Sequence, residues 1–449
     1  MIKLKILCII LFILVSIHPG ITKDNSIINI SNRLDLFVDS FLIDTLINAR
    51  LKLHEPKLTP LSENPPGRIY VTVIKDGDIY RMYSRGGKSG GSDGNLAETT
   101  LYFESQDGIS WFKPNLGLFE VDGTRNNNVI LAHDPPFSHN FCPFLDTKPD
   151  IPKQEKFKAL AGIEASGLVP FISSDGIHWK KLREEPVITK GMFDSQNVSF
   201  WSEHESCYIC YFRTWTGKNY EGLRTISRTT SKDFLHWTEP IAMNPNDEGE
   251  HLYTNGTHPY FRAPHIYIAL PTRFLPERGN TTDIVFMTSR GGNKYDRTFM
   301  ETFIRPGLDP KRWTNRANYA ALNVVPTSET EMSIYMRERR FTLRTDGFVS
   351  VNAPYHGGEI ITRSFIFDGD SLVINFSTAA SGNIQIEIQD QNGLPIPGFT
   401  LKNCPQIIGD KIEKTVSWEN RSDLSDLSGK PIRLRFVMKD ADLYSIRFK

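Results

Sequence analysis

Three acidic residues precede apolar, strand-like runs in the chain. Asp194 lies in FDSQNVSF, Glu250 lies in EGEHLYTN, and Glu331 opens EMSIY. Two carboxyl groups that face one pocket can divide acid–base work, because one donates a proton while the other activates water or attacks directly. We take Asp194, Glu331 and Glu250 as the candidate catalytic set, with Glu329 as a substitute for Glu331. The alternatives are a capped turn at Asp194 and a solvated loop acid at Glu250.

Neutral and cationic side chains recur at similar positions. His139 and Asn140 precede another strand-like run, and several arginines end such runs. An arginine can clamp a carboxylate through two parallel hydrogen bonds. Each of these residues could instead be a surface or paired group. The candidate substrate-binding set is His139, Asn140, Asn197, Arg213, His251, Asn255, Arg262, Arg273 and Arg85.

Other polar and aromatic residues have weaker claims. Asp39 in LFVDSFLID could face a central channel or pair at a sheet edge, and Asp146 in FLDTKP is interpreted as a turn residue at the opposite mouth. Aromatic rings can stack on a ligand or fill a core. The aromatic candidates are Tyr83, Trp215, Tyr253 and Tyr260.

Several chemistries lack their motifs. The sequence has no GxSxG elbow, P-loop, HExxH or dinucleotide fingerprint, so we expect no cofactor and no metal. Cys207 and Cys210 have CxxC spacing within SCYICYF, where a strand would point them to opposite faces. We therefore expect Cys142, Cys207, Cys210 and Cys404 to be buried free thiols.

A short pattern recurs along the chain and predicts the elements that position these residues. It reads SQDGISW from Ser105, SSDGIHW from Ser173 and SKDFLHW from Ser231, with weaker copies from Ser289 and Arg344. In such a turn Asp caps the backbone and Gly takes positive φ. Two strand-like runs precede each copy, such as CYICYFR and LRTISRTTS. Five four-stranded repeats predict a five-bladed β-propeller, preferred over a solenoid.

The repeat stops past Val351. The remaining segment alternates apolar and polar residues around an Asn-Gly turn, which predicts a small antiparallel β-sandwich with Trp418 in its core. The fold class is therefore all-β, with a propeller over residues 30–352 and a sandwich over 353–449. We expect the strand Leu34 to Ile43 to close the propeller by pairing with the last blade.

The N-terminus has the pattern of an export signal. Lys3 and Lys5 precede an apolar run from Ile6 to Ile17, which is too short to span a bilayer. We expect cleavage near residue 22 and a secreted or periplasmic protein, with an uncleaved anchor as the alternative. The formal net charge of zero argues against nucleic-acid binding.

The chain resembles the exported five-bladed propellers allied to glycoside hydrolase families 32 and 43, the invertase, fructanase and arabinanase-like proteins. The resemblance is carried by the SxDGxxW turns, by FDSQN, EHLYTN, PTR and HNFCPF, and by the terminal sandwich. The invertase-type signature Asn-Asp-Pro is absent, and Glu63-Asn64-Pro65 lacks its aspartate.

The resemblance implies a secreted glycoside hydrolase that cleaves a polysaccharide or oligosaccharide with paired carboxylates, by inversion if it follows the arabinanase-type proteins. The arginines would suit an acidic or sulfated sugar. The alternatives are a non-catalytic carbohydrate-binding propeller and a sialidase-like enzyme that uses Arg85, Arg213 and Arg273 with a tyrosine nucleophile. A polysaccharide lyase would use a His or Tyr base instead. The protein is expected to be a monomer or a small homo-oligomer.

Overall fold

The computed structural model describes residues 27–87, 92–218, 220–419 and 421–449. The expected export signal, residues 1–22, lies outside the described residues. The helices in the described ranges are single 3₁₀ turns, and none is long and apolar enough to cross a membrane. These turns are η1 (Leu61–Glu63), η2 (Lys153–Glu155), η3 (Pro276–Arg278), η4 (Pro310–Arg312) and η5 (Ser425–Leu427).

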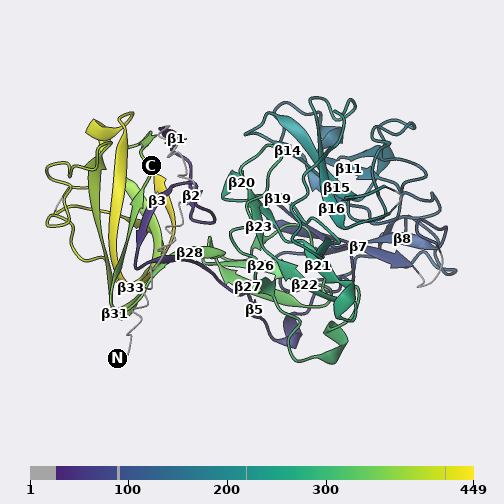
Figure 1. The fold of residues 1–449 in the computed structure, drawn as a ribbon. Coiled ribbons are helices and arrows are strands. Elements are labelled where there is room, and N and C mark those ends of the chain that lie inside the picture. The colour runs from purple at the N-terminus through teal and green to yellow at the C-terminus, as the bar shows by residue number, and fades with distance from the viewer. Residues whose placement is uncertain (1–26, 88–91, 219, 420) are drawn as a thin grey trace, which may run out of the picture.

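Five blades of antiparallel strands make up the larger unit, on the right of Figure 1. Blade 1 is β6 (Thr72–Asp76), β7 (Ile79–Gly87), β8 (Glu98–Ser105) and β9 (Val129–Leu131). Blade 2 is β10 (Pro143–Leu145), β11 (Phe157–Ala161), β12 (Val169–Ser173) and β13 (Lys180–Lys181). Blade 3 is β14 (Val198–Ser202), β15 (Cys207–Trp215), β16 (Arg224–Ser231) and β17 (Ile241–Ala242). The predicted five-bladed propeller is confirmed.

Blade 4 is divided into two short sheets. One sheet holds β18 (His251–Leu252), β21 (Thr272–Leu275), β22 (Thr281–Val285) and β24 (Thr302–Ile304). The other holds β19 (His258–Tyr260), β20 (Ala263–Ala269) and β23 (Met287–Ser289). Pro271 lies between β20 and β21, and because proline has no N–H it interrupts the ladder at that point.

Blade 5 is closed by a strand from near the N-terminus, although not by the expected one. Its sheet is β25 (Val325–Pro326), β26 (Glu331–Tyr335), β27 (Arg340–Arg344) and β5 (Lys57–Leu58). The expected closing strand, Leu34 to Ile43, pairs with the sandwich instead, so that prediction is wrong. Alternation alone fits any sheet edge, and the two-residue strand β5 carries no pattern that could have revealed it.

The second unit is the β-sandwich, on the left of Figure 1. Its C-terminal strands are β28 (Val349–Ala353), β29 (Gly358–Thr362), β30 (Phe365–Phe367), β31 (Leu372–Asp390), β32 (Asp410–Thr415) and β33 (Ile432–Phe448). Strands from the beginning of the chain complete it: β1 (Ile28–Ser31), β2 (Asp35–Leu36), β3 (Ile43–Ile47) and β4 (Arg50–Leu53). Residues 30–53, which were expected to belong to the propeller, therefore lie in the sheet of the sandwich. Trp418 is buried in the sandwich core, as expected, and donates from Nε1 to the Ile386 carbonyl at 2.7 Å.

The repeated turns have the expected chemistry. In the second copy, Oδ1 of Asp175 accepts from the backbone N–H groups of Ile177 and His178 at 2.9 and 2.8 Å. Gly176 has φ of 76°, and the Trp179 indole N–H donates to its carbonyl. In the third copy Phe234 takes the glycine position with φ of 69° and remains fully buried. These turns end the third strand of their blades.

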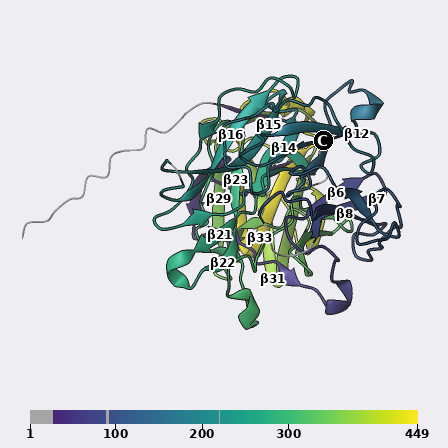
Figure 2. The same cartoon turned by 90° about the vertical axis from the view of Figure 1, so that its right-hand side faces the viewer.

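The propeller has two mouths. The innermost strands begin at one, here called the start mouth, and finish at the other, the end mouth. The sandwich packs at the end mouth, where Arg262 contacts Glu413 and Asp346, and Figure 2 views the propeller with the sandwich strands β31 and β33 behind it. A cavity of about 630 Å³ runs along the inner strands of all five blades toward the end mouth. Gln196 separates it from the start mouth, because its Nε2 reaches from blade 3 to the Val71 carbonyl of blade 1 at 3.2 Å.

Candidate functional site

Asp194 lies at the start mouth, on the loop that leads into β14. Its backbone carbonyl accepts from Asn140 Nδ2 at 2.8 Å and lies 3.2 Å from His139 Nε2, so blade 2 fixes the position of the blade 3 loop. The next residue, Ser195, donates to the Tyr253 carbonyl of blade 4 at 3.0 Å. The carboxylate itself is 27% exposed. The polar FDSQN segment is therefore held by hydrogen bonds to the neighbouring blades, while the Asp194 carboxylate remains accessible.

Two side chains contact the Asp194 carboxylate. Arg213, at the end of β15, donates from Nη2 to Oδ1 of Asp194 and is itself only 5% exposed. Glu164 lies on the hairpin between β11 and β12 and shares a hydrogen bond with Asp194. Burial, and then the negative charge of Asp194, raise the pKa of Glu164 to about 7, while Arg213 acts in the opposite direction. The site thus combines one carboxyl group that holds a proton up to neutral pH with a second that is bound to a guanidinium.

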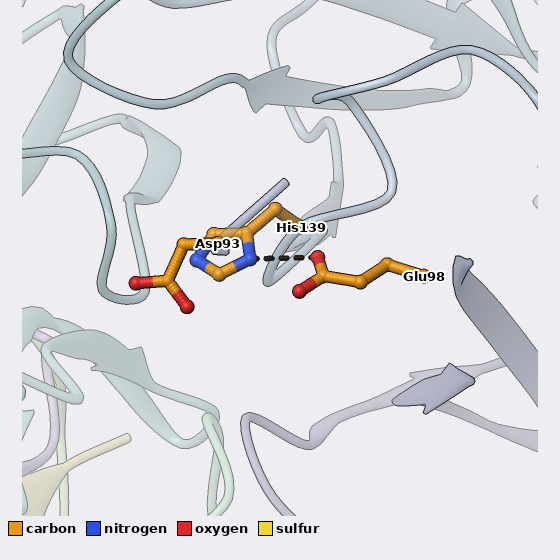
Figure 3. A group of neighbouring side chains, drawn as sticks. All are labelled: Asp93, Glu98 and His139. Atoms are coloured by element: carbon orange, nitrogen blue, oxygen red, sulfur yellow. Dashed lines mark hydrogen bonds and ion pairs between the residues drawn. The ribbon is translucent and has the colours of Figure 1, made fainter. Parts of the chain in front are cut away.

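A third acid lies near Asp194 and Glu164. Glu98, the first residue of β8, accepts from His139 Nδ1 at 2.7 Å (Figure 3). It is also ion-paired with Arg85. Burial opposes ionisation of Glu98, but the hydrogen bond and charge of His139 and the charge of Arg85 lower its pKa. Arg85 also contacts Asn140 Oδ1 at 3.5 Å. This network orients His139 and Asn140, and these two residues in turn hold the Asp194 loop.

Asp93, Glu98 and His139 form the group of side chains drawn in Figure 3, and their ligand atoms lie within 4.8 Å of one another. Such donors can bind a divalent cation. Here Nδ1 of His139 is committed to Glu98, and the Arg85 guanidinium lies against Glu98 and 3.7 Å from Asp93. A fixed cation already neutralises these acids, so we assign no metal to the group.

Three tyrosines and two further arginines complete the start mouth. Tyr70 and Tyr319 begin the inner segments of blades 1 and 5, with ring centroids 5.2 Å apart, and Tyr253 lies 5.5 Å from Tyr319. Burial raises the pKa of Tyr70 to about 12, so its hydroxyl stays protonated. The guanidinium of Arg224 lies 4.9 Å from the Tyr253 ring, and Arg316 is hydrogen-bonded to Tyr253. An aromatic and cationic wall thus faces the Asp194–Glu164 pair.

Backbone strain is found in the same place. Tyr70, Asn140 and Arg316 all have left-handed φ values, of 51°, 50° and 59°. Non-glycine residues in this region cost free energy and persist only where the surroundings hold them. All three lie at the start mouth.

Two of the predicted site residues lie at the wrong mouth. Glu331 begins β26, the second strand of blade 5, and is bound to Arg340 and to Thr327 Oγ1 at 3.2 Å. EMSIY is not the innermost strand of its blade, because the short β25 precedes it. Arg262 lies in the turn between β19 and β20 and pairs with the sandwich. Both residues therefore lie at the end mouth: Glu331 because the second strand of a blade begins where the innermost strand finishes, and Arg262 because it follows the innermost strand β19.

Glu250 and Arg273 are at the start mouth but are engaged in ion pairs. Glu250 is 4% exposed and is bound by Arg297, with Arg273 3.8 Å away. Arg273 makes two hydrogen bonds to Asp283, at 2.9 and 2.7 Å. A buried acid held in this way has no free lone pair directed at a ligand, so Glu250 is not brought into the site. The arginines of the sialidase-like alternative are each paired with a different acid: Arg85 with Glu98, Arg213 with Asp194 and Arg273 with Asp283.

The other predicted residues are distributed as follows. His139, Asn140, Arg213 and Arg85 lie in the network around Asp194. Asn197 and Asn255 are buried supports: Asn197 donates to the Phe193 carbonyl at 3.0 Å, and Asn255 donates to the Tyr211 carbonyl at 3.3 Å. His251 Nδ1 accepts from the Arg224 backbone N–H at 3.1 Å.

The remaining candidates have structural roles. Tyr83 and Tyr260 are fully buried, and Trp215 stacks on Arg224 at 4.4 Å. Asp39 pairs with Arg290. Asp146 pairs with Lys158 at the end mouth, the side on which it was expected. The four cysteines of the described ranges are buried and free, as expected.

Sequence reasoning missed Glu164, Glu98, Arg224, Arg316, Tyr70 and Tyr319. The predicted acids are those expected before the innermost strands, whereas Glu164 lies on the hairpin after a second strand and Glu98 begins a third strand. A propeller brings the ends of second strands and the beginnings of third strands to the same mouth as the beginnings of innermost strands. The run GIEASG, between two strand-like segments, was the available signal for Glu164.

Comparison with known proteins gives matches among solved structures alone. No family model matches the chain, and no curated protein sequence does. A family 43 arabinoxylan arabinofuranohydrolase from Bacillus subtilis is 12% identical, with a TM-score of 0.43, over 88% of this chain and 97% of that chain. Family 43 is one of the two families that the sequence motifs resemble.

Other matched structures differ in activity. An exo-β-1,3-galactanase from Phanerochaete chrysosporium is 9% identical, with a TM-score of 0.39, over 89% of this chain and all of that chain. An N-acetylgalactosamine deacetylase from F. plautii is 12% identical, with a TM-score of 0.41, over 89% and 96% of the two chains. At these values the assignment of the fold rests on this chain's own strand pairing, and the site has to be interpreted from its own residues.

Proposed function

We propose that the protein is an exported glycoside hydrolase whose catalytic carboxyl groups are Glu164 and Asp194. The observation that carries the proposal is their pairing at the start mouth, where one carboxyl has a pKa raised to about 7 and the other is partly exposed and bound by Arg213. Carboxyl groups whose environments separate their proton affinities are the arrangement that glycoside hydrolysis requires.

The roles follow from the environments. Glu164 is protonated below about pH 7 and donates its proton to the glycosidic oxygen as the bond to the leaving group breaks. Asp194, with Arg213 on one oxygen, stabilises the positive charge that develops on the sugar ring. His139 and Asn140 hold the backbone of Asp194, so they act as positioning residues.

The stereochemical outcome depends on the separation of the two carboxyl groups. An inverting enzyme leaves roughly 6.5 to 9.5 Å between them for a water molecule, and a retaining enzyme about 5 Å. Glu164 and Asp194 are in direct contact, which is closer than either arrangement, so this contact does not select between retention and the inversion expected from the family resemblance. Proton NMR of the first-formed anomer distinguishes the two.

The test is release of reducing sugar by the mature protein from a panel of neutral, uronic and sulfated glycans, with Asp194→Asn alongside. Release by the wild type and its loss in the variant are expected. Glu331→Gln is the matched control, because this acid is at the other mouth and should leave the rate within about twofold. Equal rates for wild type and Asp194→Asn would refute the proposed site, and glycan binding without release would support a carbohydrate-binding propeller instead.

A further inference from the structure

Three guanidinium groups surround Tyr253 at the start mouth. Those of Arg213 and Arg224 lie 5.3 and 4.9 Å from the centre of its ring, and Arg316 is hydrogen-bonded to it. They come from the end of β15, the start of β16 and the loop before blade 5. Because three separate segments supply them, the cluster is a product of the fold and not of one charged run in the sequence.

The charges in this cluster do not balance. Arg213 is ion-paired with Asp194, whereas neither Arg224 nor Arg316 has an acidic partner within ion-pair distance in the parts of the chain that the structure describes. Arg224 is half-buried between the rings of Trp215, Tyr253 and Phe274, and its Nε has no hydrogen-bond partner in these ranges. Glu164 is neutral below about pH 7, so it does not compensate the excess.

An unpaired arginine packed between rings is costly unless a ligand supplies the missing anion. Other buried arginines of the described chain have a dedicated polar partner: Arg228 pairs with Glu205, Arg290 pairs with Asp39 and Asp35, and Arg312 donates from Nε to Asn318 Oδ1 at 2.8 Å. The Nε of the half-buried Arg224 has no such partner in the described ranges, and the exposed Arg316 has no acid within ion-pair distance there; both lie at the mouth that holds the two candidate catalytic carboxyl groups.

We propose that Arg224 and Arg316 form an anion subsite, with Tyr253 between them, that holds the negatively charged group of an acidic sugar next to the Asp194–Glu164 pair. This inference rests on the proposed function for its position in the reaction, although the binding itself needs no catalysis. A planar guanidinium can hold a carboxylate or a sulfate through two parallel hydrogen bonds. The ligand class is therefore a glycan that carries carboxylate or sulfate groups.

The experiment measures binding in a Glu164→Gln background, which removes the proposed proton donor while keeping its neutral charge. The probes are immobilised oligogalacturonate, its carboxyl-reduced neutral derivative, sialyllactose, lactose, and a sulfated galactan with its desulfated form, at pH 6. Arg224→Gln and Arg316→Gln are compared with Arg278→Gln, an exposed arginine on η3. Melting temperatures confirm that each variant is folded.

We expect at least one acidic probe to bind at least about tenfold more tightly than its neutral partner. Arg224→Gln and Arg316→Gln should each remove most of that preference, Arg278→Gln should retain it, and Arg224→Lys should restore part of it. The carboxylated and sulfated probes identify which anion is preferred. Equal binding of acidic and neutral partners, or a preference that both glutamine variants retain, would overturn the subsite. If the subsite fails in this way while the wild type hydrolyses a neutral glycan, the proposed function stands without the subsite. If an acidic probe is preferred but no probe is hydrolysed, the subsite stands without the proposed function.

Discussion

Charged residues are paired differently at the two mouths of the propeller. At the end mouth and along the blade edges beside it, acids are held by dedicated cations: Asp146 by Lys158, Glu331 by Arg340, and Glu205 by Arg228. At the start mouth, one acid shares a hydrogen bond with another acid, and two arginines have no acidic partner in the described chain. The sequence contains equal numbers of acids and bases overall, so composition cannot distinguish the two ends.

This contrast separates structural charges from functional ones. A buried ion pair whose members satisfy one another is part of the packing, and removing one partner leaves an uncompensated charge. Groups that are left unmatched, or whose proton affinity is raised by a like charge, are characteristic of functional sites. Four substitutions test whether the two mouths are as different as the contacts imply.

The largest effect is expected for Asp194→Asn at the start mouth. The amide keeps the shape but loses the charge that stabilises the transition state, so kcat/KM should fall by about 10³- to 10⁴-fold, the upper range for a catalytic carboxyl. Initial rates on the best glycan of the panel measure this. Glu331→Gln should leave kcat/KM nearly unchanged, and a comparable loss in that control would mean that the two mouths had been assigned the wrong way round.

Lys158→Met should lower stability and leave activity nearly unchanged. It leaves the Asp146 carboxylate, which Lys158 contacts at 2.8 Å, buried without its cation, so the free energy of unfolding should fall by about 3 to 5 kcal/mol. Guanidinium denaturation gives the value, and kcat of the folded variant should stay within about twofold. The matched control is Lys190→Met, which breaks an exposed pair with Glu239 and should cost less than about 1 kcal/mol.

Glu164→Gln should lower kcat by about 10²-fold, the lower range for a general acid, since substrates with good leaving groups need less proton donation. The pH dependence gives the sharper test. Glu164 acts in its protonated form, so the wild-type rate should fall as pH rises through about 7, where its raised pKa lies. The glutamine variant should lack this alkaline fall in rate. An unchanged alkaline limb in the variant would assign the titration to another group.

The smallest effect is expected at a blade turn, which belongs to neither mouth's charge network. Although burial opposes ionisation, the backbone N–H of His178 and the other hydrogen bonds at the turn lower the pKa of Asp175 to about 2. A lowered folded-state pKa gives stability that is present above the unfolded value near 3.8 and is lost as pH falls toward 2. Asp175→Asn should therefore cost no more than about 1 kcal/mol at pH 6, because the carboxylate is nearly half exposed. Thermal unfolding measures the difference in melting temperature between wild type and variant, which should be smaller at pH 2.5 than at pH 6. A larger difference at pH 2.5 would contradict this account.

The sequence predicts the fold well because turn chemistry repeats. The Ser-x-Asp turn and its tryptophan follow the third strand in three blades, and the two strand-like runs before each copy occupy the second and third strands observed. The sandwich is likewise signalled by two-residue alternation. Ring closure was not predictable, because β5 is two residues long and both are exposed.

The site was predicted in part. Asp194, Arg213, His139 and Asn140 were found because acids and amides before an innermost strand are placed at one mouth by topology alone. Glu331 was predicted at the start mouth because β25, the innermost strand of its blade, was not recognised. That strand contains Pro326 and follows the left-handed Asn323, so its sequence lacks a strand pattern. Glu164 was missed because its hairpin reaches Asp194 from another blade, a contact between residues 30 positions apart that no local pattern encodes.

The sandwich is assembled from both ends of the chain, and this has a consequence for synthesis. Asp35 and Leu36 pair with Ile446 and Ser445, so the partner of this early segment is made only after roughly 400 more residues have been translated. At about 5 to 20 residues per second the segment waits on the order of 20 to 80 seconds, while the propeller blades leave the ribosome in order. A chain truncated after residue 352 would never receive the partner. Such a fragment would carry permanently exposed strand edges at residues 28–47, which makes it prone to aggregation and unsuitable as an isolated catalytic domain.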